Sequence, residues 1–142
     1  MTAGLKISGY ASRFDERDAG GDRVRRGAFA ASLLSRSTSL PMLSDHQRQI
    51  GVWDRVTEDG TGLFVEGRVT DPALTRLITA GKVNGLSIGY RTRRATPREG
   101  GRDLLDLDLR EISVVAFPML GSARIDTVSE PVTERTNHRR LA

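Results

Sequence analysis

The chain has 142 residues, of which 37% are apolar, and this is enough for one domain with a single hydrophobic core. It contains no cysteine, which excludes disulfide scaffolds, thiolate nucleophiles and cysteine-ligated zinc. The net charge is +4, but 18 acidic residues are spread among the basic ones and no aromatic residues alternate with the arginine clusters. We therefore expect no specific nucleic-acid binding. We also expect no membrane span, since no apolar run approaches the roughly 20 residues that a bilayer requires.

The first half of the chain has mainly the patterns of strands. Apolar and polar or small residues alternate over residues 5–11, and a glycine-containing acidic loop follows at 18–22. Apolar residues at helical spacing predict a short helix over 27–34. Two β-rich segments, 50–56 and 62–69, flank an acidic turn that contains glycine, so we expect an antiparallel hairpin. The large aromatic residues of these segments are expected in the core.

The second half contains one more helix and two longer strands. An aspartate cap followed by proline predicts a helix over 72–80. Strands are expected over about 85–94 and 104–117, separated by a turn at 97–101. From Ser129 onward polar and charged residues predominate, so we expect a single domain over residues 1–128 and a flexible polar tail over 129–142.

The order of these elements predicts the fold class. Strands outnumber helices, and they do not alternate regularly with helices as in a parallel α/β protein. We therefore expect a mainly β protein with flanking helices, a β-rich α+β fold built on a mostly antiparallel sheet or barrel.

A serine and a histidine are the candidates for chemistry. Ser87 lies in Gly85-Leu86-Ser87-Ile88-Gly89-Tyr90, where the flanking glycines leave its hydroxyl uncrowded. A serine nucleophile needs a base, and of the two histidines only His46 lies in an ordered-looking segment. Each also has a purely structural interpretation: a small residue in a tightly packed strand for Ser87, and a turn residue capping a carbonyl for His46.

Several segments together resemble a known family, the prohead maturation proteases of tailed phages with HK97-type capsids. These proteases share a fold and ancestry with the herpesvirus assemblins, and the resemblance extends from about Gly9 to Ile125. The segments are Gly9-Tyr10-Ala11, Gly27-Ala28-Phe29, Met42 to His46, Gly62 to Gly67, Gly85 to Tyr90 and Leu109 to Pro118. The resemblance implies an assemblin-like β-barrel surrounded by short helices.

Carried onto the matching positions, the resemblance makes Ser87 the nucleophile, His46 the general base and Glu111 the third member that holds the imidazole. Assemblins use a second histidine in that third role, whereas His138 here lies outside the matched region. Strand alternation puts Glu111 and Ser113 on one face, so a catalytic Glu111 requires a polar pocket on that side.

Glu111 also has a structural interpretation, and other residues can take the role of the third member. Glu111 fits an exposed strand acid paired with an arginine, such as Arg110 or Arg91. Substitutes for the third member are Asp45, Asp108 and Asp126.

The resemblance also implies a substrate and a place of action. We expect a serine endopeptidase, without cofactor or metal, that cleaves scaffold material or the scaffolding extension of the major capsid protein. It would act inside the assembling procapsid, in the cytoplasm of the bacterial host. Because assemblins are activated by dimerisation, we expect a homodimer or a larger homo-oligomer.

Two functions from other classes are alternatives. The first is a catalytically silent capsid-assembly or scaffolding protein with the same fold, which the presence of both Ser87 and His46 argues against. The second is a small basic nucleic-acid-binding barrel, whose DNA affinity would fall steeply as salt rises.

Overall fold

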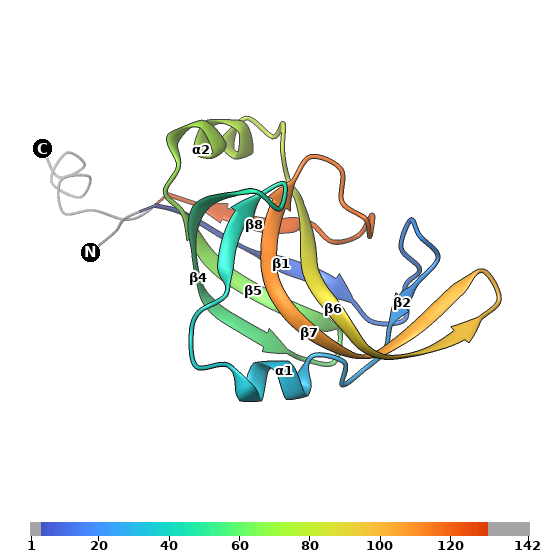
Figure 1. Ribbon diagram of the computed structural model, residues 1–142. Coiled ribbons are helices and arrows are strands. Elements are labelled where there is room, and N and C mark those ends of the chain that lie inside the picture. Colours follow the sequence, from blue (N-terminus) through green and yellow to red (C-terminus); the bar gives the residue numbers. More distant parts are fainter. Residues whose placement is uncertain (1–3, 131–142) are drawn as a thin grey trace, which may run out of the picture.

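Strand β7 (Gly101–Val115) organises the sheet, because it pairs with three other strands in the computed structural model, which describes residues 4–130 (Figure 1). Strand β6 (Gly85–Arg98) runs antiparallel along one edge of β7. The short strands β2 (Arg23–Val24) and β3 (Pro41–Ser44) both run parallel to β7 and share its other edge.

The remaining strands continue the sheet from β3 by antiparallel pairing. They follow in the order β4 (Arg48–Glu58), β5 (Gly62–Val69), β1 (Leu5–Arg13) and β8 (Ile125–Ser129). The predicted hairpin is confirmed, since β4 and β5 pair antiparallel from Gly51↔Val69 to Glu58↔Leu63.

Backbone hydrogen bonds close this sheet into a barrel. The N–H of Leu86, at the start of β6, donates to the carbonyl of Ala123 at 2.9 Å. The N–H of Ile125, at the start of β8, donates to the carbonyl of Asn84 at 2.8 Å. The expected β-rich barrel is therefore confirmed, although the two parallel pairs with β7 make the sheet mixed.

Two short helices lie outside the barrel, at opposite ends in Figure 1. Helix α2 (Pro72–Thr79) is close to the prediction, and its Asp71 cap accepts a hydrogen bond from the Leu74 N–H at 3.0 Å. Helix α1 (Ala30–Ser35) begins three residues later than predicted. The reason is Gly27, whose φ of +89° turns the chain before the helix can start.

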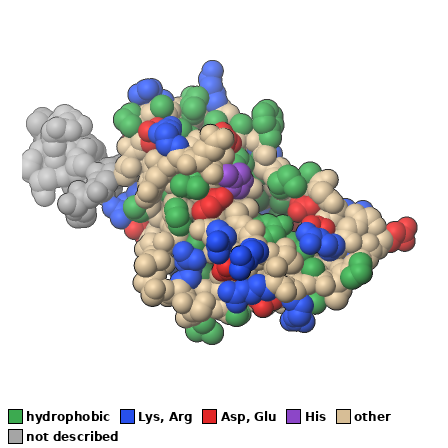
Figure 2. Space-filling view, viewed as in Figure 1, with side chains coloured by type: hydrophobic (Ala, Val, Ile, Leu, Met, Phe, Trp, Pro, Cys, Tyr) green, Lys and Arg blue, Asp and Glu red, His purple; other side chains and the backbone are tan. Residues whose placement is uncertain are grey.

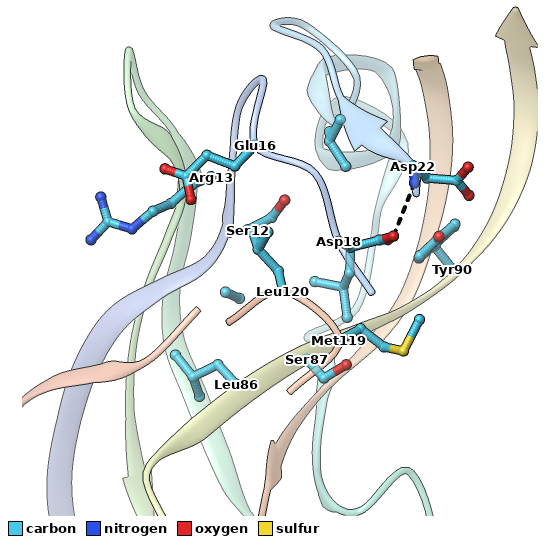
Figure 3. Close-up of a pocket in the computed structure, with 13 residues that line it drawn as sticks. Ser12, Arg13, Glu16, Asp18, Asp22, Leu86, Ser87, Tyr90, Met119 and Leu120 are labelled. Carbon is cyan, nitrogen blue, oxygen red and sulfur yellow. Dashed lines mark hydrogen bonds between the residues drawn. The ribbon is translucent and has the colours of Figure 1, made fainter. Parts of the chain in front are cut away.

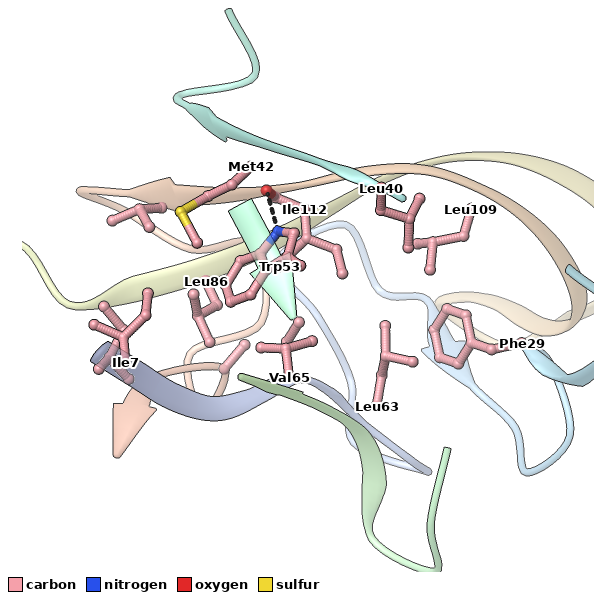
Figure 4. Close-up of a cluster of buried hydrophobic side chains, with 14 of the residues drawn as sticks. Ile7, Phe29, Leu40, Met42, Trp53, Leu63, Val65, Leu86, Leu109 and Ile112 are labelled. Carbon is pink, nitrogen blue, oxygen red and sulfur yellow. Dashed lines mark hydrogen bonds between the residues drawn. The ribbon is translucent and has the colours of Figure 1, made fainter. Parts of the chain in front are cut away.

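The core fills the barrel with side chains from almost every strand. Figure 4 shows this cluster, in which the Trp53 indole N–H donates to the Ile112 carbonyl at 3.2 Å. Trp53 is buried as expected, whereas Phe64 is only partly buried and contacts the Tyr10 ring edge-on. Phe64 differs from the prediction because it alternates with Leu63 and Val65, which take the inward positions of β5.

Two further expectations about boundaries were wrong. The β6–β7 pairing continues past the predicted end at Arg94 to Arg98↔Gly101, so the hairpin extends well beyond the barrel (Figure 1). Strand β8 was not predicted at all. It forms by pairing with β1, and this pairing sets its register.

Of the expected tail 129–142, residues 131–142 lie outside the described residues. Among residues 4–130, no helix has both the length and the apolar composition needed to cross a membrane.

Candidate active site

Three polar side chains meet on the outer face of the barrel. His46 Nδ1 forms a hydrogen bond with Glu111 Oε2. Ser113 Oγ donates to Glu111 Oε1 at 2.8 Å and accepts the backbone N–H of His46 at 2.9 Å. The Glu111 side chain is only 13% exposed, whereas that of His46 is 43% exposed. The carboxylate is therefore largely shielded and fully hydrogen-bonded, while the imidazole stays accessible on the face shown in Figure 2.

A tight turn between β3 and β4 presents His46. The Gln47 N–H donates to the Ser44 carbonyl at 3.0 Å, and Asp45 and His46 both have positive φ, +47° and +64°. These two residues lie in the three-residue loop between Ser44 and Arg48, and non-glycine residues adopt positive φ only at an energetic cost. The Asp45 N–H also bonds to the Val114 carbonyl at 3.1 Å, which ties the turn to β7. The imidazole is thus fixed beside Glu111 by backbone contacts on both sides.

Ser87 lies next to this group through the register of β6 and β7. It is directly opposite Ser113, so their Cα atoms are separated by about 4.5–5.5 Å. Ser87 is 7% exposed, and within residues 4–130 its hydroxyl has no hydrogen-bond partner. Ser87 thus lies opposite the serine that bonds to both His46 and Glu111. In serine hydrolases the hydrogen bond between nucleophile and base is often long or absent before substrate binds.

Gly89 makes room for the Glu111 carboxylate. The two residues are opposite each other in the β6–β7 register. A Cβ atom at Gly89 would lie 2.1 Å from Glu111 Oε2, well inside van der Waals contact. The second glycine of the serine segment is therefore required by the position of the acid.

A pocket opens beside Ser87, at the seam of the barrel between β6 and β1 (Figure 3). The cavity volume that water can occupy is about 60 Å³. Its inner wall is apolar, and four charged residues from the β1 end and the following loop surround it. The pocket is lined by Ala11, Ser12, Arg13, Glu16, Asp18, Asp22, Val24, Leu86, Ser87, Ile88, Tyr90, Met119 and Leu120.

The charges in this pocket are not balanced. Asp22 pairs with Arg102 at 2.8 Å, and the hydrogen bond from Arg102 holds the pKa of this carboxyl below its usual range. Asp18 and Glu16 have no ion-pair partner among the described residues. Burial raises the pKa of Tyr90, and the negative charges of Asp18 and Asp22 raise it further.

A comparison of the sequence with models of protein families also points to a serine protease. The family model for the caudovirus prohead serine protease matches residues 2–138, nearly the whole chain. The chain belongs to this prohead serine protease family.

Two curated relatives carry the same name. The prohead protease of Enterobacteria phage HK97 is 34% identical over 123 residues, which are 79% of this chain and 55% of that protein. The prohead protease of Escherichia phage T5 is 32% identical over 123 residues, which are 80% of this chain and 58% of that protein. The chain thus spans little more than half the length of these relatives.

Solved structures share the fold of this prohead protease family member. The KSHV protease in complex with a hexapeptide phosphonate inhibitor has a TM-score of 0.64 at 14% identity, covering 97% of this chain and 75% of that one. The bacteriophage T4 capsid assembly protease gp21 has a TM-score of 0.62 at 15% identity, covering 79% of this chain and 82% of that one. At these identities the likeness concerns the fold alone.

The structure brings the three predicted site residues of this family member to one face. Glu111 contacts His46 and Ser113 and, among residues 4–130, forms no ion pair with an arginine. Arg110 bonds instead to Asp108 at 2.9 Å. The other predicted substitutes, Asp45 and Asp126, make no contact with the His46 ring among residues 4–130.

Sequence reasoning missed the role of Ser113. The signal was present, since Ser113 follows Glu111 by two residues and so shares its face of the strand. This serine supplies the polar surroundings that a buried Glu111 requires.

Proposed function

We propose that this chain is a serine endopeptidase that cleaves scaffold material, or the scaffolding extension of the major capsid protein, during procapsid maturation. The observation that carries the proposal is the His46–Glu111 hydrogen bond together with the pairing of Ser87 opposite Ser113, the residue that bonds to both His46 and Glu111. The names of the HK97 and T5 relatives support the assignment to proheads.

The geometry supports a division of roles among three residues. Ser87 Oγ attacks the substrate carbonyl, and the exposed Nε2 of His46 accepts its proton. His46 then gives this proton to the leaving amine, and water hydrolyses the resulting acyl-enzyme with the same base. Glu111 accepts the Nδ1–H, which fixes the tautomer and stabilises the imidazolium that forms.

The outer edge of β6 supports an extended binding mode for the peptide. After Leu86, whose N–H bonds to Ala123, β6 has no backbone partner on this edge among the described residues. An extended peptide can add to such an edge as another strand. A substrate bound there would pass Ser87 and the pocket beside it.

The same proposal covers where the protease acts and which molecules it binds. The protease would act within the procapsid in the cytoplasm of the bacterial host, as a homodimer or larger homo-oligomer. We propose no specific binding to DNA. Arg23 and Arg25, two members of one arginine cluster, both bond to Asp103, which reduces the charge that this cluster offers to phosphates. Filter binding across a salt series would detect any DNA affinity.

Co-expression with the major capsid protein, the proposed substrate, tests the proposal. Intact-mass analysis should show that the wild type shortens the capsid protein and that Ser87→Ala leaves it full length. Ser37→Ala is the matched control, because Ser37 is an exposed serine outside the pocket. Equal, unprocessed masses with wild type and Ser87→Ala, under conditions where shells assemble, would favour the catalytically silent assembly protein instead.

A further inference from the structure

We infer that the pocket beside Ser87 selects a basic side chain, lysine or arginine, on the residue whose carbonyl Ser87 attacks. This inference rests on the proposed function and concerns the substrate class of the same site. A pocket whose wall includes the nucleophile receives the side chain nearest to the bond that is cleaved. The chemistry of the lining residues then decides which side chain is accepted.

The inner part of the pocket suits an aliphatic stem. Leu86 and Tyr90 of β6 form one wall, and Met119 of the segment after β7 lies between Ser87 and the acidic loop in Figure 3. Leu86 is almost fully buried, whereas Met119 is 53% exposed. The exposed Met119 side chain is long and flexible, so it can pack along the methylene groups of a lysine or arginine.

Two hydroxyl groups without protein partners line the same pocket. Ser12 is 3% exposed and Ser87 is 7% exposed, and neither hydroxyl has a hydrogen-bond partner among the described residues. A hydroxyl group can both donate and accept, so each is available to a polar group of a ligand in the pocket. While Ser87 reacts, the Ser12 hydroxyl remains as an acceptor for an N–H donor.

Asp18 supplies the charge. Its Oδ1 accepts the backbone N–H groups of Gly20 at 2.9 Å and Asp22 at 3.0 Å, and Figure 3 shows the second of these bonds. These bonds hold the carboxylate in place at the pocket, while no hydrogen bond to Oδ2 occurs among the described residues. A fixed carboxylate with a free oxygen, only partly exposed, is a specific acceptor for an ammonium or guanidinium group.

The remaining charges do not cancel that of Asp18. Arg102 is paired with Asp22. Arg13 donates to the Ser122 carbonyl at 3.3 Å and lies over the Tyr10 ring, and Glu16 accepts a hydrogen bond from the Ser122 hydroxyl. The positive charge of Arg13 offsets that of Glu16, so the lining keeps the net negative charge of Asp18, which repels an acidic side chain. An apolar side chain would leave the hydroxyl of Ser12 unpaired.

A charge exchange between enzyme and substrate tests the inference. The wild-type enzyme is co-expressed with the major capsid protein, and the cut sites are located by intact mass. We expect lysine or arginine immediately before each Ser87-dependent cut. Changing that residue to glutamate should reduce cleavage by at least about tenfold, the effect of one charge-assisted hydrogen bond. Asp18→Lys should restore cleavage of the glutamate substrate and lose cleavage of the natural one.

Controls separate this inference from the proposed function. Asp18→Asn should lower cleavage about tenfold, whereas Asp106→Asn, an aspartate outside the pocket, should leave it unchanged. Thermal melting verifies that both variants are folded. Ser87-dependent cuts after residues of other classes, or an Asp18→Lys variant that keeps the natural preference, would overturn the inference alone. Identical masses with wild type and Ser87→Ala would overturn both the inference and the proposed function.

Discussion

Replacing Gly89 with alanine should inactivate the enzyme without unfolding it. The new Cβ would lie 2.1 Å from Glu111 Oε2, and an ordinary contact needs 3.4 Å, so this oxygen must move by about 1.3 Å. The atoms in the way belong to the end of the Glu111 side chain, which can rotate, so the backbone need not shift. Alanine also loses less backbone entropy than glycine in a strand, by about 0.5–1 kcal/mol. Stability should therefore change little.

The loss of activity follows from the displacement of the acid. A misplacement of about 1 Å can cost about 10²-fold in rate, and loss of the acid from a serine protease triad costs about 10⁴-fold. We expect Gly89→Ala to lie between these limits. Processing of the co-expressed capsid protein, followed over time by mass, measures the rate, and thermal melting measures the fold.

Gly121→Ala is the matched control, because a Cβ there meets no atom within 4 Å. Gly89→Ala with full activity would show that Glu111 does not need its position beside His46, and the reasoning would fail. If Gly89→Ala melted far below Gly121→Ala, the assumption that the Glu111 side chain yields would be wrong.

Three other changes have defined outcomes. Ser113→Ala removes hydrogen bonds to His46 and Glu111, so kcat should fall about 10–100-fold while KM is kept, measured on the same substrate. Trp53→Phe deletes the donor to the Ile112 carbonyl and should lower the free energy of unfolding by about 1–3 kcal/mol in urea titrations. Asp103→Asn should destabilise at pH 7, and this destabilisation should shrink as the pH is lowered through the depressed pKa of Asp103. Hydrogen bonding from Arg23 lowers the pKa of Asp103 in the folded state, so the folded carboxyl binds fewer protons than the unfolded one. The contribution of Asp103 to the free energy of unfolding is therefore lost as the pH falls through the folded pKa. A difference that persists unchanged at acid pH would contradict this assignment.

Local patterns were sufficient for most of the fold. Alternation in β1, β5 and β7 and the proline-containing start of α2 are properties of the residues themselves, and each of these elements formed where the pattern indicated. Strand β8 has no such pattern of its own, because only its first residue, Ile125, is buried. It is a strand because β1 offers an edge, which is a property of the tertiary structure.

The candidate site, like the fold, could be predicted from the sequence only in part. The residue types and settings of Ser87 and His46 indicated a nucleophile and a base, whereas Glu111 came from the family resemblance. Alternation already paired Glu111 with Ser113 on one face. The opposition of Gly89 to Glu111 depends on the register of β6 against β7, which shifts between Gly89 and Tyr90. The acidic pocket depends on the loop after β1 folding across to β6. Neither could be derived from spacing along the chain.

The bonds that close the barrel also determine when the site can form during synthesis. The strand that carries Ser87 is held at its beginning by Ala123 and Arg124, and the next strand, β8, completes the sheet against β1. A nascent chain that ends before residue 123 therefore lacks the contacts that fix Ser87 beside His46. Under the proposed function, the chain can therefore cleave its substrate only after β8 has been made.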